Sequence, residues 1–309
     1  MMSLTRRKLL SMAAAGAAVP LGAFGQPART RVRFSVDWVW QGNHSIWTLA
    51  ADQGLFAAEN LDAVLDRGYG SADNLTKLGA GSLDIALIDP NLLAKFNQEN
   101  PGSQMVAVCI VYDEAKGAVI SLKSAGIKSV KDLEGKKIAA TESDATYLLF
   151  RALCKVNNVD INKIEIINVS PQLRDSLVIQ KRADASIGFY STAVLNIAAA
   201  GVPLADIDYL QYSKSGLPLY SLALVCKKDY AAANPAVVSG FVRATVQGAQ
   251  AVLKDPKAAI ASLVRRDPLL KADLELQRLE LVNKSSFLTT WVRQNGMSTV
   301  DRARFENTT

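Results

Sequence analysis

Polar and aromatic residues that could bind a small molecule follow the ends of two predicted strands in the first third of the chain. Asp37-Trp38 closes the alternating apolar segment 32–38, and Asn43-His44 ends the polar loop that follows. Tyr69-Gly70-Ser71 comes after a second strand-like segment, residues 61–65. Aromatic rings, an imidazole and a helix start with free N–H groups can stack on a flat polar molecule and orient it. This chemistry is that of binding, and the sequence shows no metal site.

A repeated strand–helix pattern would bring these residues to one edge of a parallel sheet. Residues 83–88 read as a third strand, stopped by Asp89-Pro90, and apolar positions between the strands predict helices. Ligands in open α/β sheets bind beyond the carboxyl ends of the strands, where all these residues would lie. Asp89 is expected to cap the helix that starts at Pro90, and it could also accept a hydrogen bond from a ligand amine.

The middle of the chain carries a second, independent α/β pattern. Residues 137–140, 164–169 and 185–189 read as strands, each followed by an apolar helical stripe. Asp144 is expected to cap one of these helices. Ser143, Asp144 and Tyr147, at the start of that helix, and Tyr190, after the 185–189 strand, are predicted to face the same cleft as the first group of residues.

The segment from residue 37 to residue 84 resembles the solute-binding proteins of bacterial ABC importers. The branch is that of carriers of thiamine pyrimidine precursors and of sulfonate- and taurine-binding proteins. The resemblance rests on Asp37-Trp38 with Asn43-His44, Gly54-x-Phe56, Leu61-Asp62 and Gly81-x-x-Asp84, and continues more weakly to about residue 205.

This resemblance implies a type II periplasmic binding protein, in which two α/β lobes enclose a ligand cleft. Each lobe is expected to be a mostly parallel sheet flanked by helices. Two crossover segments would form the hinge between them. Lobe one would comprise residues 30–115 and 217–309, and lobe two residues 116–216.

Each candidate contact also has a structural interpretation. Trp38 could be a packed core indole, and Trp40, which stands where the family often has Pro, could cover the cleft surface. His44 and Asn43 could cap the next helix, as Ser71 is expected to do for its own. The predicted ligand contacts are Trp38, Trp40, Asn43, His44, Tyr69, Ser71, Asp89, Ser143, Tyr147 and Tyr190.

Five aromatic residues among these contacts favour a flat heteroaromatic or aromatic ligand, such as a pyrimidine. Pyrimidine-binding relatives often place an acidic residue near the segment that corresponds to residues 188–192. That segment contains none here, which weakens the pyrimidine assignment. A sulfonate-, taurine- or nitrate-like anion is the alternative ligand, although no opposed pair of buried arginines is visible.

The predicted function is capture of a small solute and its delivery to an inner-membrane ABC permease with its ATPase, without catalysis or cofactor. Relatives that synthesise the thiamine pyrimidine use lysine-bound pyridoxal phosphate and a cysteine-rich motif, which this chain lacks. A sensor domain docking on a membrane receptor is a third interpretation. A monomer is expected.

Residues 1–25 read as a secretory signal peptide. Arg6, Arg7 and Lys8 precede a short apolar run, a pattern typical of twin-arginine export to the periplasm. No Cys lies near the expected cleavage site, so a lipid anchor is not expected. Removing these three cations lowers the formal net charge from +6 to +3. The sequence has no Lys/Arg run interleaved with aromatics, so it gives no indication of nucleic-acid binding. The three cysteines are expected to be buried reduced thiols.

Overall fold

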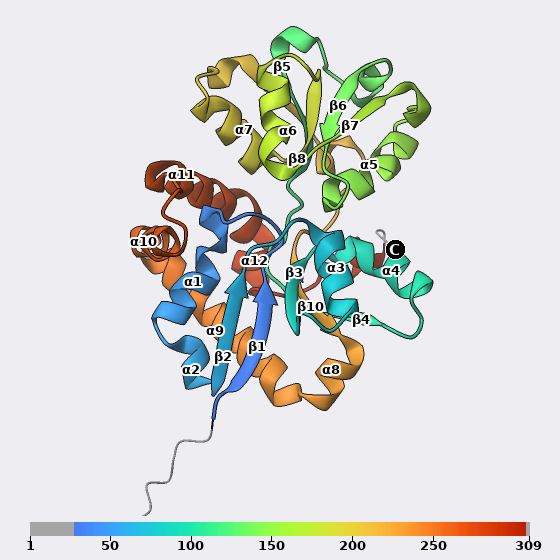
Figure 1. Ribbon diagram of the computed structural model, residues 1–309. Coiled ribbons are helices and arrows are strands. Elements are labelled where there is room, and N and C mark those ends of the chain that lie inside the picture. Colours follow the sequence, from blue (N-terminus) through green and yellow to red (C-terminus); the bar gives the residue numbers. More distant parts are fainter. Residues whose placement is uncertain (1–27, 307–309) are drawn as a thin grey trace, which may run out of the picture.

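Strands from both ends of the chain form the first sheet of the computed structural model, which describes residues 28–306 (Figure 1). The strand order is β2-β1-β3-β10-β4. The strands are β1 (Thr30–Ser35), β2 (Leu61–Asp66), β3 (Ile85–Ile88), β4 (Met105–Ile110) and β10 (Ala223–Lys227). β1 pairs in parallel with β2 and β3, whereas β10 runs antiparallel to β3 and β4.

Helices cover both faces of this sheet and with it make up lobe one. On one face the apolar sides of the N-terminal and C-terminal helices pack together through Phe34, Trp47 and Phe241. On the other face Leu75 and Leu78 pack against β3 and β4. The helices are α1 (Ser45–Asp52), α2 (Leu55–Ala58), α3 (Ser71–Gly79), α4 (Leu93–Glu99), α8 (Lys228–Ala233), α9 (Pro235–Lys254), α10 (Pro256–Arg266), α11 (Ala272–Val282), α12 (Thr290–Asn295) and α13 (Arg302–Glu306).

The middle of the chain forms lobe two on the same plan. Its sheet has the order β7-β6-β8-β5-β9, with β5 antiparallel to both neighbours. The strands are β5 (Gly117–Leu122), β6 (Lys137–Ala140), β7 (Glu165–Asn168), β8 (Ala185–Phe189) and β9 (Ile207–Gln211). The helices are α5 (Ala145–Val156), α6 (Pro171–Ile179) and α7 (Tyr190–Ala199). The predicted two-lobe α/β fold is confirmed. Both sheets are mixed, because the strands next to the crossovers pair antiparallel with their neighbours.

Two neighbouring crossovers join the lobes. Residues 111–116 lead from β4 to β5, and residues 212–222 lead from β9 back to β10. Hydrogen bonds tie them together, from Val111 N to Leu222 O (2.9 Å) and from Ser221 N to Tyr112 O (3.2 Å). Paired strands of this kind can bend together while each lobe stays rigid, which is the geometry of a hinge.

The C-terminal helix braces this hinge. Arg304 of α13 donates to the Asp113 carboxylate (3.0 Å) in the first crossover and to the Leu219 carbonyl (2.7 Å) in the second. Its guanidinium also lies 3.9 Å from the centre of the Tyr220 ring. The end of the chain therefore fixes the two crossovers relative to each other.

Several local predictions can be compared directly with the structure. Gly54 adopts φ +71° after α1, and Asp144 caps α5 by accepting from Thr146 N (2.9 Å), both as predicted. Asp89 likewise caps the short turn at Pro90 through Asn91 N (2.9 Å). The prediction that Ser71 caps α3 is wrong. Gly70 holds the capping position because only glycine adopts its φ of +116° readily, and Ser71 begins the helix.

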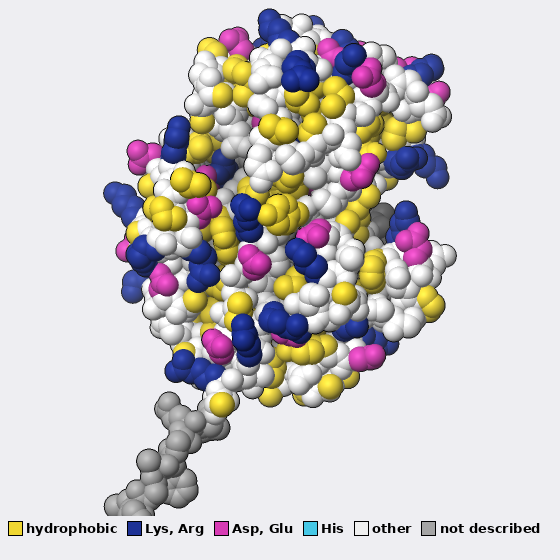
Figure 2. All heavy atoms as spheres, viewed as in Figure 1, with side chains coloured by type: hydrophobic (Ala, Val, Ile, Leu, Met, Phe, Trp, Pro, Cys, Tyr) yellow, Lys and Arg dark blue, Asp and Glu magenta, His cyan; other side chains and the backbone are white. Residues whose placement is uncertain are grey.

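The remaining sequence-based expectations concern the thiols, the surface and the N-terminus. Cys109, Cys154 and Cys226 are buried and free. On the face shown in Figure 2, basic and acidic side chains are interspersed. Within residues 28–306, no helix combines the length and apolar character needed to cross a bilayer. The predicted signal peptide lies outside the described residues.

Candidate ligand-binding site

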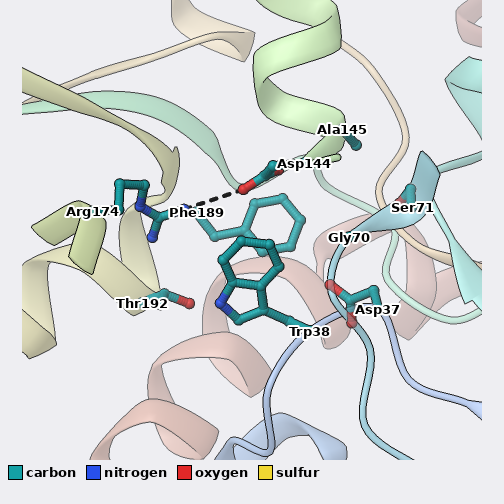
Figure 3. A pocket seen from close by; sticks show the side chains of 9 residues that line it. All are labelled: Asp37, Trp38, Gly70, Ser71, Asp144, Ala145, Arg174, Phe189 and Thr192. Carbon is teal, nitrogen blue, oxygen red and sulfur yellow. Dashed lines mark hydrogen bonds and ion pairs between the residues drawn. The ribbon is translucent and has the colours of Figure 1, made fainter. Parts of the chain in front are cut away.

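A small cavity lies between the lobes, beyond the carboxyl ends of β1 and β8 and at the start of α3 and α5 (Figure 3). Its volume is about 10 Å³, room for roughly one water molecule. Entry of a pyrimidine-sized ring therefore requires lining side chains to move apart. The cavity is lined by Asp37, Trp38, Gly70 and Ser71 of lobe one and by Asp144, Ala145, Arg174, Phe189 and Thr192 of lobe two.

Two aromatic rings and a guanidinium fill most of the space. In Figure 3 the Trp38 indole lies in the middle of the view and overlaps the Phe189 ring. The Arg174 guanidinium carbon is 5.3 Å from the Trp38 ring centre, within the range of a cation–π contact. When the lobes separate, a flat ligand can stack against these planar groups.

Arg174 is held by two carboxylates. Its side chain is 1 % exposed, and it pairs with Asp144 (3.1 Å) and Asp175 (3.0 Å). The guanidinium also packs flat on Gly188, where an added Cβ would lie 2.4 Å from Nη1. Burial nevertheless raises the pKa of Asp144. The charge of Arg174 opposes this effect of burial on Asp144.

His44 positions the second cavity carboxylate, that of Asp37. Its Nδ1 accepts a hydrogen bond from Gln41 N (3.1 Å), so the ring proton of the neutral form is on Nε2. Nε2 can then donate to Asp37 Oδ1, 3.1 Å away. The imidazole is buried behind Asp37, and its ring makes no capping bond to α1. His44 thus holds the N-cap position of α1 without a side-chain bond to that helix, and its ring contacts Asp37 and Gln41 instead.

Asp89 is a third buried acid near the cavity. Burial, reinforced by the charges of Asp144 and Asp37, raises its pKa from 3.8 to about 6 against the opposing hydrogen bonds from Asn91. Its backbone N donates to the Ser71 hydroxyl (3.0 Å), which links it to the cavity wall. The bottom of the cleft therefore concentrates negative charge.

Replacing Asp89 by asparagine is expected to reduce the pH dependence of stability. Because its folded pKa is raised, Asp89 favours folding fully below pH 3.8, and that contribution is lost as pH rises through about 6. The variant keeps an oxygen for the cap but does not ionise. As the pH rises from 4 to 7, the free energy of unfolding of the variant should therefore increase relative to that of wild type, by up to about 3 kcal/mol.

Urea denaturation at pH 4, 5, 6 and 7 measures this difference. Asp229→Asn, a change at an exposed residue of α8, is the matched control and should show a much flatter difference. If the stability of Asp89→Asn depended on pH in the same way as that of wild type, the raised pKa of Asp89 would be contradicted.

The lobes touch on both sides of the cavity. At one rim, Ala72 N donates to Ser143 O (3.1 Å), and the Ser143 hydroxyl donates to Tyr69 O. The backbones come so close there that a Cβ on Gly70 would lie 2.3 Å from Ser143 O. At the other rim, the Thr192 hydroxyl donates to Gln41 Oε1 (2.9 Å). The structure is therefore a closed form.

A chain of buried polar contacts connects the second rim to the cavity. Arg278 of α11 donates to Asn196 of α7 (2.8 Å), and Asn196 donates to Asp175 (2.7 Å), which pairs with Arg174. Arg278 also pairs with Glu275, whose carboxylate accepts from Gly42 N (2.6 Å). Lobe closure and the position of Arg174 are therefore physically coupled.

The structure brings together only part of the predicted contact set. Trp38 and Ser71 line the cavity, Asp89 lies behind Ser71, and Ser143 forms the rim contact. Asn43 is buried outside the cavity lining, where its carbonyl accepts from the Tyr112 hydroxyl (2.7 Å). Ligand contact by these residues stays a prediction.

Four of the predicted aromatic contacts lie elsewhere. Trp40 is buried in the core of lobe one, edge-on to His44. Tyr69 is 39 % exposed and holds Arg67 through its hydroxyl. Tyr147 lines a separate groove between α5 and the helices α3 and α4. Tyr190 stacks on Tyr209 in the core of lobe two, at a centroid distance of 5.2 Å.

The predicted contact set omitted five polar or aromatic side chains of the cavity lining. Asp37 and Asp144 were visible as a motif residue and as a cap, and Phe189 as the end of a strand. Nothing in the sequence distinguished Arg174 or Thr192, because an arginine or threonine on a helix is usually solvated. The omitted side chains are Asp37, Asp144, Arg174, Phe189 and Thr192.

Residues 41–259 match the family described as NMT1/THI5 like. The chain belongs to this family. The predicted family resemblance is thereby confirmed for most of the chain. In this NMT1/THI5-like chain, Asp37 and Trp38 lie just before the matched region, and the other cavity-lining residues lie inside it.

Curated relatives include both binding proteins and enzymes. A formylaminopyrimidine-binding protein of Halalkalibacterium halodurans is 23% identical over 267 residues, covering 86% of this chain and 79% of that protein. A 4-amino-5-hydroxymethyl-2-methylpyrimidine phosphate synthase of Legionella pneumophila is 20% identical over 246 residues, covering 80% of this chain and 77% of that protein.

A solved structure confirms the fold. The periplasmic aliphatic sulphonate binding protein SsuA from Escherichia coli matches with a TM-score of 0.63 at 19% identity. The match covers 81% of this chain and 83% of that chain. This NMT1/THI5-like protein therefore has the fold of periplasmic binding proteins.

Proposed function

We propose that this protein is the periplasmic receptor of an ABC importer and that it captures one small amino-substituted heteroaromatic molecule, such as a pyrimidine. The observation that carries the proposal is the pair of buried carboxylates, Asp37 and Asp144, in the wall of a cavity shared by two lobes. Delivery to an inner-membrane permease with its ATPase, by a monomeric receptor, is part of the same proposal.

The charges favour a ligand that donates hydrogen bonds. Asp37 has oxygen acceptors available to an amine or ring N–H, whereas Nε and Nη1 of Arg174 already donate to Asp175 and Asp144. Near this site four buried acids, Asp37, Asp89, Asp144 and Asp175, outnumber the two buried cations, Arg174 and Lys116, which disfavours the sulfonate alternative. Asp37 and Asp144 also supply the acidic group that the 188–192 segment lacks.

Ligand-driven closure follows from the two-lobe geometry. We take residues 30–115 and 217–309 as lobe one and residues 116–216 as lobe two, with the paired crossovers as the hinge. A molecule that contacts Asp37 and Trp38 on one side and Asp144 and Phe189 on the other binds the closed state preferentially. Such differential affinity is what shifts the population toward closure.

Replacing Trp38 by leucine should weaken ligand binding by about 1–3 kcal/mol, because a stacking face of that value is lost. Isothermal titration with 4-amino-2-methylpyrimidine measures the change. Trp291→Leu is the matched control, since Trp291 lies on α12 outside the cavity lining. Equal affinity of the Trp38 variant and wild type would contradict a stacking role.

A thermal-shift screen tests the proposed ligand class. The panel should include aminopyrimidines, flavin-like compounds, aromatic acids and alkylsulfonates. A true ligand at 100 times its Kd adds about 2.7 kcal/mol to the free energy of unfolding. We expect stabilisation by aminopyrimidines. Stabilisation by alkylsulfonates alone would establish the anion-receptor alternative instead.

An enzymatic function is the second candidate, because a relative is named as a pyrimidine phosphate synthase. The three cysteines lie apart in the sequence and are buried, so they do not form a cysteine-rich motif. Within the described part of the chain, no group of His, Cys, Asp and Glu is arranged to hold a metal. Absorbance of an internal aldimine after addition of pyridoxal phosphate would favour this candidate.

A further inference from the structure

Lys116, the last residue of the first hinge crossover, is a buried ammonium beside the candidate site. Its side chain is 1 % exposed, and its backbone oxygen accepts from Tyr190 N (3.0 Å) at the end of β8. The Nζ atom lies 4.1 Å from the centre of the Tyr112 ring and 4.7 Å from the centre of the Phe189 ring. One of these rings, Phe189, belongs to the cavity wall (Figure 3).

The ammonium has aromatic neighbours but no hydrogen-bond acceptor. Among residues 28–306, no carboxylate, carbonyl or hydroxyl pairs with its Nζ. Asp37 and Asp89 act on it electrostatically from a greater distance, while burial lowers its pKa to about 8. A cationic side chain that is almost fully buried and has no hydrogen-bond acceptor is costly, and such a group calls for a functional explanation.

The Phe189 ring borders both the cavity and this ammonium. Because the cavity is too small for a ring, a heteroaromatic ligand must displace Trp38 or Phe189 as it enters. Movement of Phe189 would uncover the Lys116 ammonium at the bottom of the site. The ligand would then meet a cationic donor there and the Asp37 acceptor in the opposite lobe.

We propose that Lys116 determines ligand specificity by donating a hydrogen bond to an uncharged acceptor on the ligand, a carbonyl oxygen. This proposal rests on the proposed function and narrows it: the ligand carries an acceptor for Lys116 next to a donor for Asp37. An uncharged acceptor is favoured over a carboxylate because Asp37 and Asp89 already place two negative charges near the ammonium.

The competing explanation is that Lys116 only balances those two carboxylates. Removing its charge would then lower stability and weaken every ligand alike. A ligand-contacting Lys116 instead affects ligands that carry the acceptor. Two pairs of compounds that differ in a carbonyl group separate these explanations.

The test uses Lys116→Met, which keeps the length of the side chain without its charge, in the full mature chain. Isothermal titration compares 4-amino-2-methylpyrimidine-5-carboxamide with 4-amino-2,5-dimethylpyrimidine, and nicotinamide with 3-methylpyridine. A hydrogen bond to a charged donor should give wild type a 10- to 150-fold preference, roughly, for the carbonyl compound of a pair. Lys227→Met, whose ammonium binds the Gly79 carbonyl far from the cleft, is the matched control.

The expected result is a carbonyl preference in wild type and Lys227→Met that disappears in Lys116→Met. A preference that survives in Lys116→Met, or no preference in wild type for either pair, overturns the inference. If only the pyridine pair binds and shows the Lys116-dependent preference, the aminopyrimidine proposal fails while the role of Lys116 stands.

A second readout covers a variant that does not fold. In wild type labelled with ¹³C at lysine Cε, the carbonyl compound should shift the Lys116 signal, which is assigned from a Lys116→Arg spectrum. A Lys116 signal unmoved by saturating ligand overturns the proposal.

Discussion

Arg174→Met should lower the free energy of unfolding by about 3–5 kcal/mol at pH 7. The change leaves the buried carboxylates of Asp144 and Asp175 without their cation, and uncompensated buried charge carries a penalty of this size. Methionine retains most of the apolar contacts of the arginine stem. Urea denaturation monitored by circular dichroism gives the difference directly.

The matched control is Arg243→Met, which breaks an ion pair with Glu59 on the surface. Arg243 is 56 % exposed, so this loss should be below about 1 kcal/mol. Adding Asp144→Asn to Arg174→Met should recover part of the stability, because it removes one of the stranded charges. Equal effects of Arg174→Met and Arg243→Met would show that the buried network is not what the geometry indicates.

Gly70→Ala should reduce ligand affinity by about 5- to 150-fold, the equivalent of 1–3 kcal/mol of backbone strain and steric conflict. The added Cβ would lie 2.3 Å from Ser143 O of the other lobe, so it opposes closure directly. Apparent affinity falls in proportion to the closed fraction that remains available. Isothermal titration measures the affinity, and small-angle scattering with saturating ligand measures the closure.

Gly81→Ala is the matched control for this change. Gly81 also has a positive φ, +71°, but an added Cβ meets nothing within 4 Å. Its variant should bear backbone strain within lobe one and still close around the ligand with near wild-type affinity. Equal loss of affinity in both variants would assign the effect to lobe one alone and not to the contact between the lobes.

The fold was accessible from the sequence because its signals are local. Alternation at residues 32–38, the glycine at position 54 and the acids before α5 and Pro90 each specify a strand, a helix end or a cap from neighbouring residues. The combination of strand–helix repeats with two crossovers then leaves few topologies. The Ser71 cap failed because Gly70, with its unusual φ, took that position.

The site was less accessible because side-chain direction depends on distant neighbours. Tyr190 follows β8 as predicted, yet its ring turns to Tyr209 on β9 and away from the cavity. Sequence position gives the place of a residue along an element, whereas partners on other elements decide which way it points. Arg174 was not predicted yet lies in the cavity wall, because it is held there by Asp144, a carboxylate partner thirty residues away.

Titration of 4-amino-2-methylpyrimidine into wild type and Asp37→Asn tests most directly whether a buried carboxylate in the interlobe cleft recognises an amino-substituted ring. The account predicts one site per chain in wild type and an affinity lower by about 10- to 150-fold in Asp37→Asn, because a charged hydrogen bond is lost. Equal affinity in the two proteins, or binding at a stoichiometry other than one, would contradict it.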